Sequence, residues 1–92
     1  MKIQYTERFL HDLDRLSSTQ HEHVLQVVEK LPVAMGAPHR HAGIGMRKIH
    51  RSGIYEARIG LNLRMLFTQQ KDCLRLHRVG DHAMVRRYLR QL

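Results

Sequence analysis

The fold of this chain is decided by residues 46–82, which read MRKIH-RSG-IYEARI-GLN-LRMLFT-QQKD-CLRLHRV-GDH. Four of these segments are rich in apolar and β-branched residues that alternate with polar ones, as β-strands do. The short segments between them contain Gly, Asn, Asp or Ser, which tolerate the dihedral angles of tight turns. The pattern predicts a four-stranded antiparallel meander with strands at Met46–His50, Ile54–Ile59, Leu63–Thr68 and Cys73–Val79.

Counting through the turns predicts which residues face each other across the meander. The expected pairs are His50 with Ile54, Lys48 with Glu56, Ile59 with Leu63, Arg58 with Arg64, Phe67 with Leu74, Met65 with Leu76, and Arg64 with His77.

Because side chains alternate between the two faces of a sheet, this register predicts one apolar face and one basic face. The apolar face would contain Ile49, Tyr55, Ala57, Ile59, Leu63, Met65, Phe67, Leu74 and Leu76. The basic face would contain Lys48, Glu56, Arg58, Arg64, Arg75 and His77, with Leu66 as its main apolar member.

The expected pairing of Arg58 with Arg64 points to an anion site. Like charges that face each other across two strands destabilise the pair by up to about 1 kcal/mol. An anion between the two guanidinium groups, with His77 beside them, would remove that cost, and phosphate suits the guanidinium fork. The alternative is two solvated arginines that point apart and bind nothing.

The residues on either side of the meander predict three helices. Lys2–Tyr5 is expected to be a short strand at or near a sheet edge, followed by a helix from an N-cap at Thr6 to about Leu16. A capping box formed by Thr19 and Glu22 would begin a second helix, which Leu31-Pro32 would end. Residues 33–45 are expected to be a loop, and Asp81 caps a short C-terminal helix.

The order of these elements predicts an α+β fold: a short N-terminal strand, a helical hairpin, and a four-stranded antiparallel meander with helices on one face, then the C-terminal helix. At 92 residues the chain is expected to form a single domain over 1–92. No apolar run is long enough to span a bilayer, and the N-terminus lacks a signal-peptide core. The single cysteine, Cys73, fits a reducing cytosol, so a cytoplasmic location is expected.

The charge of the chain favours a polyanionic partner. Sixteen Lys and Arg against eight Asp and Glu give a net charge of +8. Most of the acids lie in the first third, whereas the part from Arg40 to Arg90 is overwhelmingly basic. Nucleic acid is the first candidate for such a surface, and an acidic protein is the second.

Four sequence stretches, taken in order, resemble the RelE/ParE superfamily of bacterial toxin–antitoxin toxins. They are Gly45-Met46-Arg47-Lys48-Ile49-His50, Gly53-Ile54-Tyr55-Glu56-Ala57-Arg58, Leu63-Arg64-Met65-Leu66-Phe67 and Arg78-Val79-Gly80-Asp81-His82. The resemblance covers nearly the whole chain in element order and length. It implies a cytoplasmic toxin that an antitoxin wraps and neutralises through an acidic segment.

Two activities occur on this fold, and the resemblance leaves both open. RelE-like members cleave mRNA in the ribosomal A site without a metal, on a basic sheet face. ParE-like members inhibit DNA gyrase and are not nucleases. A third reading is a non-catalytic nucleic-acid-binding module.

The resemblance suggests specific residues for RNA cleavage. Arg58 and Arg64 match basic strand residues of RelE-like toxins, and His82 matches a histidine that some nuclease members carry after the last strand. Glu56 stands where one relative has lysine, and Tyr88 lies near the C-terminal tyrosine of some members in an uncertain register.

The chemistry of cleavage needs cations for the phosphate and groups that carry protons. The candidate catalytic residues are Arg58, Arg64, His82, Glu56 and His77, with Glu56 or His77 as the second proton carrier. The candidate RNA-binding residues are Lys48, Arg47, Arg75 and Arg86. His82 is equally well read as a residue at the start of a helix with no chemical role.

No cofactor or metal is expected. His39, His41 and His50 are the best candidates for a zinc site, but this pattern lacks a carboxylate or cysteine at ligand spacing. Arg86, Arg87 and Arg90 are most simply a solvated helix face that adds contacts to ribosomal RNA or to the antitoxin.

Overall fold

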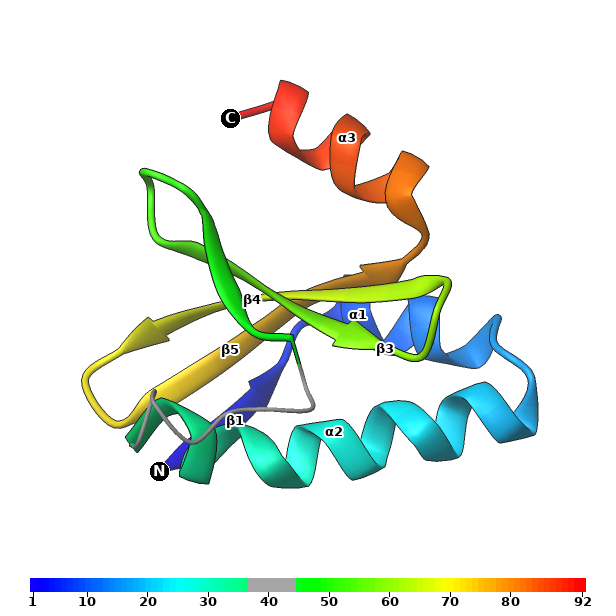
Figure 1. Cartoon of the computed structure of the whole chain (residues 1–92), viewed down its shortest axis with the longest axis horizontal. Helices are drawn as coiled ribbons and strands as arrows, with labels where there is room; N and C mark the ends of the chain where they lie inside the picture. Colours follow the sequence, from blue (N-terminus) through cyan, green and yellow to red (C-terminus); the bar gives the residue numbers. More distant parts are fainter. Residues whose placement is uncertain (37–44) are drawn as a thin grey trace.

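A computed structural model describes residues 1–36 and 45–92 (Figure 1). All five strands form one sheet in the order β1-β5-β4-β3-β2, in which β1 runs parallel to β5 and every other pair is antiparallel. The α+β class, the meander and the edge position of the first strand are confirmed. In chain order the elements are β1 (Lys2–Tyr5), α1 (Glu7–Asp14), α2 (Ser18–Gly36), β2 (Arg47–His50), β3 (Ile54–Ile59), β4 (Leu63–Gln70), β5 (Cys73–Gly80) and α3 (His82–Arg90).

Helices α1 and α2 cover one face of the sheet and form the main core with it (Figure 1). Phe9 of α1 and Leu31 of α2 are fully buried against the strands. Tyr55 packs on this core and stacks on Phe67, with 5.6 Å between the ring centroids. Apart from Ile49, the residues expected on the apolar face all belong to this core: Tyr55, Ala57, Ile59, Leu63, Met65, Phe67, Leu74 and Leu76.

Helix α3 lies on the other face of the sheet, which corrects the expectation that the helices gather on one side (Figure 1). Leu66 and Ile54 point away from the main core and would be exposed without a cover. Met84 and Val85 of α3 bury them in a second, smaller cluster that Ile49, Tyr88 and Leu89 complete.

In the first two hairpins, the structure confirms three of the four predicted pairs and contradicts the fourth. His50 faces Ile54, Arg58 faces Arg64 and Ile59 faces Leu63, as expected. Glu56, however, faces Arg47 rather than Lys48, because the register shifts between Lys48 and His50. The extra residue on β2 is Ile49, which therefore packs with α3 and not with the main core.

The predicted register of β4 with β5 is wrong. The strands continue to a two-residue turn at Lys71-Asp72, where Lys71 has φ 51°, and Gln70 faces Cys73. A second register shift lies between Leu66 and Phe67. The shorter turn alone displaces the pairing by two residues, which keeps every side chain on its expected face. Phe67 therefore faces Leu76, and the second shift displaces the pairing by one further residue, so that Met65 faces Val79 and Arg64 faces Gly80.

The helical hairpin begins as predicted and continues further. Thr6 caps α1 and accepts a hydrogen bond from the Phe9 N–H at 3.1 Å. The capping box of α2 is formed by Ser17 and Gln20, not by Thr19 and Glu22, since each of the first two accepts the other's backbone N–H at 3.2 Å. The helix then runs through Pro32 to Gly36, so the predicted end is wrong; Ala34 prolongs the buried stripe of Val24, Val27, Val28 and Leu31. The rest of the predicted loop, 37–44, lies outside the described residues.

The edge of the sheet beyond β1 is closed by a side chain. β1 ends at Tyr5, opposite Leu76, so the last residues of β5 have no neighbouring strand on the side away from β4. Asp12 of α1 takes that place: its carboxylate accepts the Val79 N–H at 3.1 Å and the Arg78 guanidinium at 2.7 and 3.2 Å. This contact ties α1 to the end of β5. None of the described helices is long and apolar enough to cross a membrane.

The capping box allows a direct test of where α2 begins. We expect Ser17→Ala to lower the free energy of unfolding by about 1 kcal/mol, because it removes an acceptor for the Gln20 N–H. Thr19→Ala should change stability little, because Thr19 is an exposed helical residue and alanine favours helix. Urea unfolding of both variants measures this, and an equal loss in the two would contradict the position of the cap.

Candidate functional site

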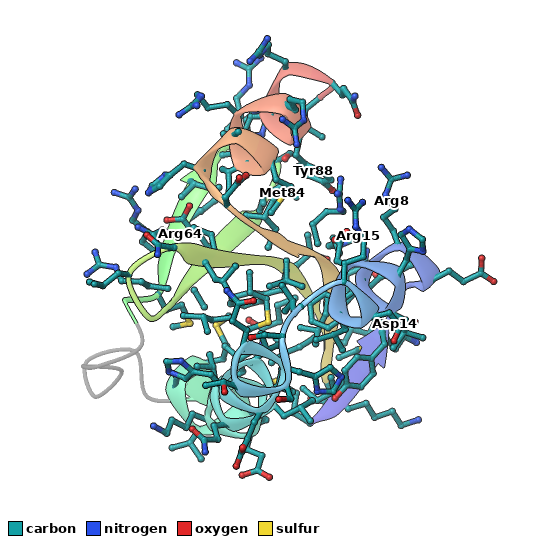
Figure 2. The ribbon with its side chains drawn as sticks, turned by 90° about the vertical axis from the view of Figure 1, so that its right-hand side faces the viewer. Arg8, Asp14, Arg15, Arg64, Met84 and Tyr88 are labelled. Atoms are coloured by element: carbon teal, nitrogen blue, oxygen red, sulfur yellow. The ribbon has the colours of Figure 1, made fainter. Side chains whose placement is uncertain are left out.

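Arg64 of β4 is the centre of the candidate site, although only 8% of the residue is exposed. Its Nη1 donates to the backbone oxygens of Leu63 at 2.9 Å and Leu61 at 3.4 Å. Its Nη2 lies 2.9 Å from Nε2 of His82. These contacts hold the guanidinium group in one orientation at the point where α3 begins (Figure 2).

The junction of β5 and α3 brings His82 to Arg64. β5 ends at Gly80, which faces Arg64 across the strands. Asp81 then caps α3, and its Oδ1 accepts the Met84 N–H at 2.9 Å. That hydrogen bond is the main cause of the lowered pKa of Asp81. His82 is the first residue of α3 and its ring lies over the guanidinium group.

The contact between Arg64 and His82 fixes the state of the imidazole ring. A guanidinium group has only donors, so Nε2 of His82 must be the acceptor. An imidazole in that state can take up a proton at Nε2, which is what a general base does.

Glu56 holds Arg64 from the other side. The residue is 5% exposed, and its Oε1 lies 3.9 Å from Nε of Arg64 and 3.5 Å from Nε of Arg47. The Glu56 carboxylate is thus shared between two guanidinium groups, which occupy the oxygen that a proton carrier would use. This geometry suits a residue that orients Arg64 better than it suits the proton carrier that the sequence suggested.

Arg58 faces Arg64 across β3 and β4, and its side chain is exposed. The backbone before β2 passes close to it at Gly45, which has φ 54°. A Cβ atom at position 45 would lie 3.1 Å from Cβ of Arg58, so glycine allows this approach. The two arginines thus sit on one face, with Arg58 open to solvent and Arg64 held by the protein.

His77 is not part of this cluster. Gly80 rather than His77 faces Arg64, and the His77 ring bonds to the Thr68 hydroxyl, with 2.8 Å between Nε2 and Oγ1. Thr68 lies four residues along β4 from Arg64, a separation of roughly 13 Å. The exposed Arg75 also faces Thr68, so neither basic side chain of this part of β5 reaches Arg64.

The environment of His77 predicts a pH effect on stability. Burial first, and then the charge of Arg75, lower its pKa below the usual 6.5. As pH falls below 6.5, the unfolded chain therefore binds a proton at His77 before the folded chain does. The free energy of unfolding falls over this pH range as a result. We expect His77→Gln to unfold with a shallower loss of stability just below that pH. Chemical denaturation of both proteins from pH 7.5 to 5 measures the difference, and parallel curves would contradict it.

A groove of about 440 Å³ lies between β2 and α3 and reaches the candidate site. Glu56 and His82 lie on its wall, and its other lining residues are apolar or basic: Ile49, Val85, Leu89, Arg47, Lys48 and Arg86. Three of the four predicted RNA-binding residues are thus brought together here. Strict alternation in β2 predicted Ile49 on the opposite face, and Ile49 enters the groove only through the β2 bulge. The three-residue turn ending in Gly53 does not mark that bulge, because the extra residue lies before the turn.

The metal-site alternative concerns residues that the structure describes only in part. In residues 1–36 and 45–92 no three His, Cys, Asp or Glu side chains come together in a way that could hold a metal ion. His50 is engaged locally, since its Nδ1 accepts the Ser52 N–H at 3.0 Å. His39 and His41 lie outside the described residues.

Comparison with known proteins shows a likeness of structure. Neither a family model nor a curated protein matches the sequence. The structure resembles YafQ from E. coli strain BL21(DE3) with a TM-score of 0.72 and 19% identity, over 91% of this chain and 96% of that one. The chain has the fold of the RelE-like toxins. A chain of the RelB–RelE antitoxin–toxin complex from Methanococcus jannaschii gives 0.70 and 16%, over 92% and 96%; the YoeB/ParE toxin from Agrobacterium tumefaciens gives 0.67 and 19%, over 89% and 99%.

The RelE-like fold confirms the resemblance seen in the sequence at the level of architecture. Identities of 16% and 19% leave the chemistry to be argued from the residues of this chain.

Proposed function

We propose that this protein is the toxin of a type II toxin–antitoxin system and a RelE-like, ribosome-dependent mRNA endonuclease. The observation that supports the proposal best is the contact between Arg64 and His82. It joins a cation to an imidazole whose Nε2 can accept a proton once Arg64 donates to the phosphate instead. A ribosomal target implies a cytoplasmic location.

The proposed reaction is attack by the 2′ oxygen of the message on the adjacent phosphorus. Nε2 of His82 takes the proton of the 2′-hydroxyl, and the 2′ oxygen forms a bond to phosphorus. The bond from phosphorus to the 5′ oxygen breaks, and the imidazolium returns the proton to that oxygen. The products are a 2′,3′-cyclic phosphate and a 5′-hydroxyl, with atoms and protons in balance.

Arg64 and Arg58 supply the electrostatic part of this mechanism. Negative charge grows on the phosphate oxygens as the 2′ oxygen attacks, and cations fixed beside them are usually the largest single contribution to such a reaction. When substrate binds, Nη2 of Arg64 donates to the phosphate in place of Nε2 of His82, which leaves Nε2 able to act as the base. Glu56 keeps its ion pairs with Arg47 and Arg64, and His77 has no part in the step.

The second candidate is gyrase inhibition, and one experiment separates the two. Programmed ribosomes that carry a labelled message are incubated with the toxin, beside a gyrase supercoiling assay. We expect a cleaved message and normal supercoiling. An intact message together with blocked supercoiling would show that the protein inhibits gyrase, as ParE-like toxins do, and is not a nuclease.

We further propose that the groove between β2 and α3 binds an acidic segment of the antitoxin. The crystal structures with this fold include an E. coli DinJ–YafQ complex and the M. jannaschii RelB–RelE antitoxin–toxin complex. Here the groove combines apolar anchors, Val85 and Leu89, with a rim of three cations. A segment bound there would cover Glu56 and His82 and so block the chemistry.

The salt dependence of the complex tests the antitoxin groove. We expect the dissociation constant for the antitoxin to rise with ionic strength, because exposed cations on the rim are screened. Arg86→Gln should weaken binding and reduce this dependence, whereas Arg51→Gln, an exposed arginine of the β2–β3 turn, should not. Isothermal titration at three salt concentrations decides this. If neither salt nor Arg86→Gln changes the dissociation constant, the groove is not the binding site of the antitoxin.

A further inference from the structure

A second groove lies on the opposite side of α3, between that helix and α1. Its volume is about 200 Å³, and its lining includes Arg15, Arg78 and Arg87 from three different elements. It shares no lining residue with the groove beside β2. α3 therefore separates two cationic surfaces, and the proposed cleavage uses only one of them.

Of the three arginines that line this second groove, one is neutralised by a salt bridge to a described residue and two are not. Arg78 is paired with Asp12, whose carboxylate is fully used by Arg78 and the Val79 N–H. Asp81 accepts the Met84 N–H, and Arg87 acts on it from nearby. Within the part of the chain that the structure describes, no salt bridge holds Arg15 or Arg87.

The sequence of α1 extends the cationic wall. Arg8 and Arg15 are seven residues apart, which places them two turns apart on one face of the helix. Both are exposed, and Figure 2 shows them extending from α1 on the side of the molecule where Met84 and Tyr88 of α3 lie. The acids Glu7 and Asp14 fall on another side of this helix by the same spacing.

The groove lacks the apolar anchors that a protein partner needs. Val79 and Met84 line it but are 3% and 4% exposed, so they offer almost no surface. Leu16, the third apolar residue of the lining, is partly buried and packs against the main core. Protein interfaces depend on a few large side chains that enter apolar pockets. A row of free arginines without such pockets fits the phosphates of a nucleic acid backbone, which fix orientation without reading sequence.

We infer that the groove between α1 and α3 is a second, non-catalytic binding surface for the phosphate backbone of RNA, formed by Arg15 and Arg87 with Arg8 at its end. The inference rests on the proposed RNA target of this protein. The groove holds a segment of structured RNA, while the message lies at Arg64 and His82 on the other side of α3. Two contacts on either side of one helix would fix the orientation of the toxin on its target.

The test measures binding of an RNA duplex of about 16 base pairs, long enough to present both strands, over a range of salt concentrations. We compare the double variant Arg15→Gln/Arg87→Gln with the control Lys30→Gln/Arg51→Gln. The control removes two exposed charges that lie in neither groove. The double variant should bind roughly tenfold more weakly at moderate salt, and its plot of log affinity against log salt should be shallower by about 2. The control should match the wild type.

Three results would overturn the inference. They are an unchanged slope in the double variant, an equal loss in the control, and a loss of polyglutamate binding as large as the loss of duplex binding. The last result would assign the groove to an acidic polypeptide. If the wild type binds the duplex through Arg15 and Arg87 yet leaves the message intact on ribosomes, the nuclease proposal fails and this inference stands.

Discussion

Arg64→Gln and His82→Gln are each expected to reduce cleavage of ribosome-bound message by a hundredfold or more. Loss of Arg64 removes the fixed cation at the phosphate, and such groups are commonly worth two to three orders of magnitude in rate, or about 3 kcal/mol. Loss of His82 removes the only imidazole in contact with Arg64 among the described residues, and a general base contributes about 10² to 10⁴.

The rate constant at saturating toxin distinguishes chemistry from binding. Both variants should lower this constant, because the lost groups act on the reacting atoms. His23→Gln is the matched control for the imidazole, since His23 is an exposed residue of α2. Circular dichroism must show that Arg64→Gln is folded, because the change leaves Glu56 with Arg47 alone. A folded Arg64→Gln protein with full activity would exclude the proposed mechanism.

Asp12→Ala should lower the free energy of unfolding by about 2 to 3 kcal/mol, because it leaves the partly buried Arg78 guanidinium without its partner. The change also leaves the Val79 N–H without an acceptor at the open edge of β5. Native domains have on the order of 5 to 15 kcal/mol of stability, so a loss of this size is a large fraction of the total.

Asp14→Ala provides the control for this measurement. Asp14 belongs to the same helix but is exposed, and the change should stay within about 0.5 kcal/mol. Urea denaturation of the two variants gives the comparison. If Asp12→Ala costs no more than Asp14→Ala, the carboxylate does not hold α1 to β5.

Regular alternation made much of the fold predictable from the sequence. Met65, Phe67, Leu74 and Leu76 lie on the expected face, although both predicted pairs among them were wrong. The two-residue shift at the turn preserves the alternation, and the one extra residue at the second shift leaves Met65 in the core opposite Val79. The pair Arg58 and Arg64 was found for the same reason: a short turn at Gly60 fixes the register of that hairpin. Local pattern thus located the centre of the candidate site.

What local pattern could not show depends on single extra residues and on distant contacts. The bulge at Ile49 turns one side chain to the other face and so builds the apolar part of the groove. The shifts in β4 and β5 removed His77 from Arg64. Asp12 lies 66 residues from Arg78 in the chain, and the spacing of α1 marks it only as a polar residue beside Leu13.

The central claim is that Arg64 and His82 cleave RNA through its own 2′-hydroxyl. The most direct measurement uses two messages on programmed ribosomes, one entirely ribonucleotide and one with a single 2′-deoxynucleotide at the cleaved position. The account predicts that the first is cut to a 2′,3′-cyclic phosphate end and that the second remains intact. Cleavage of the deoxy-substituted message at the same bond would contradict it.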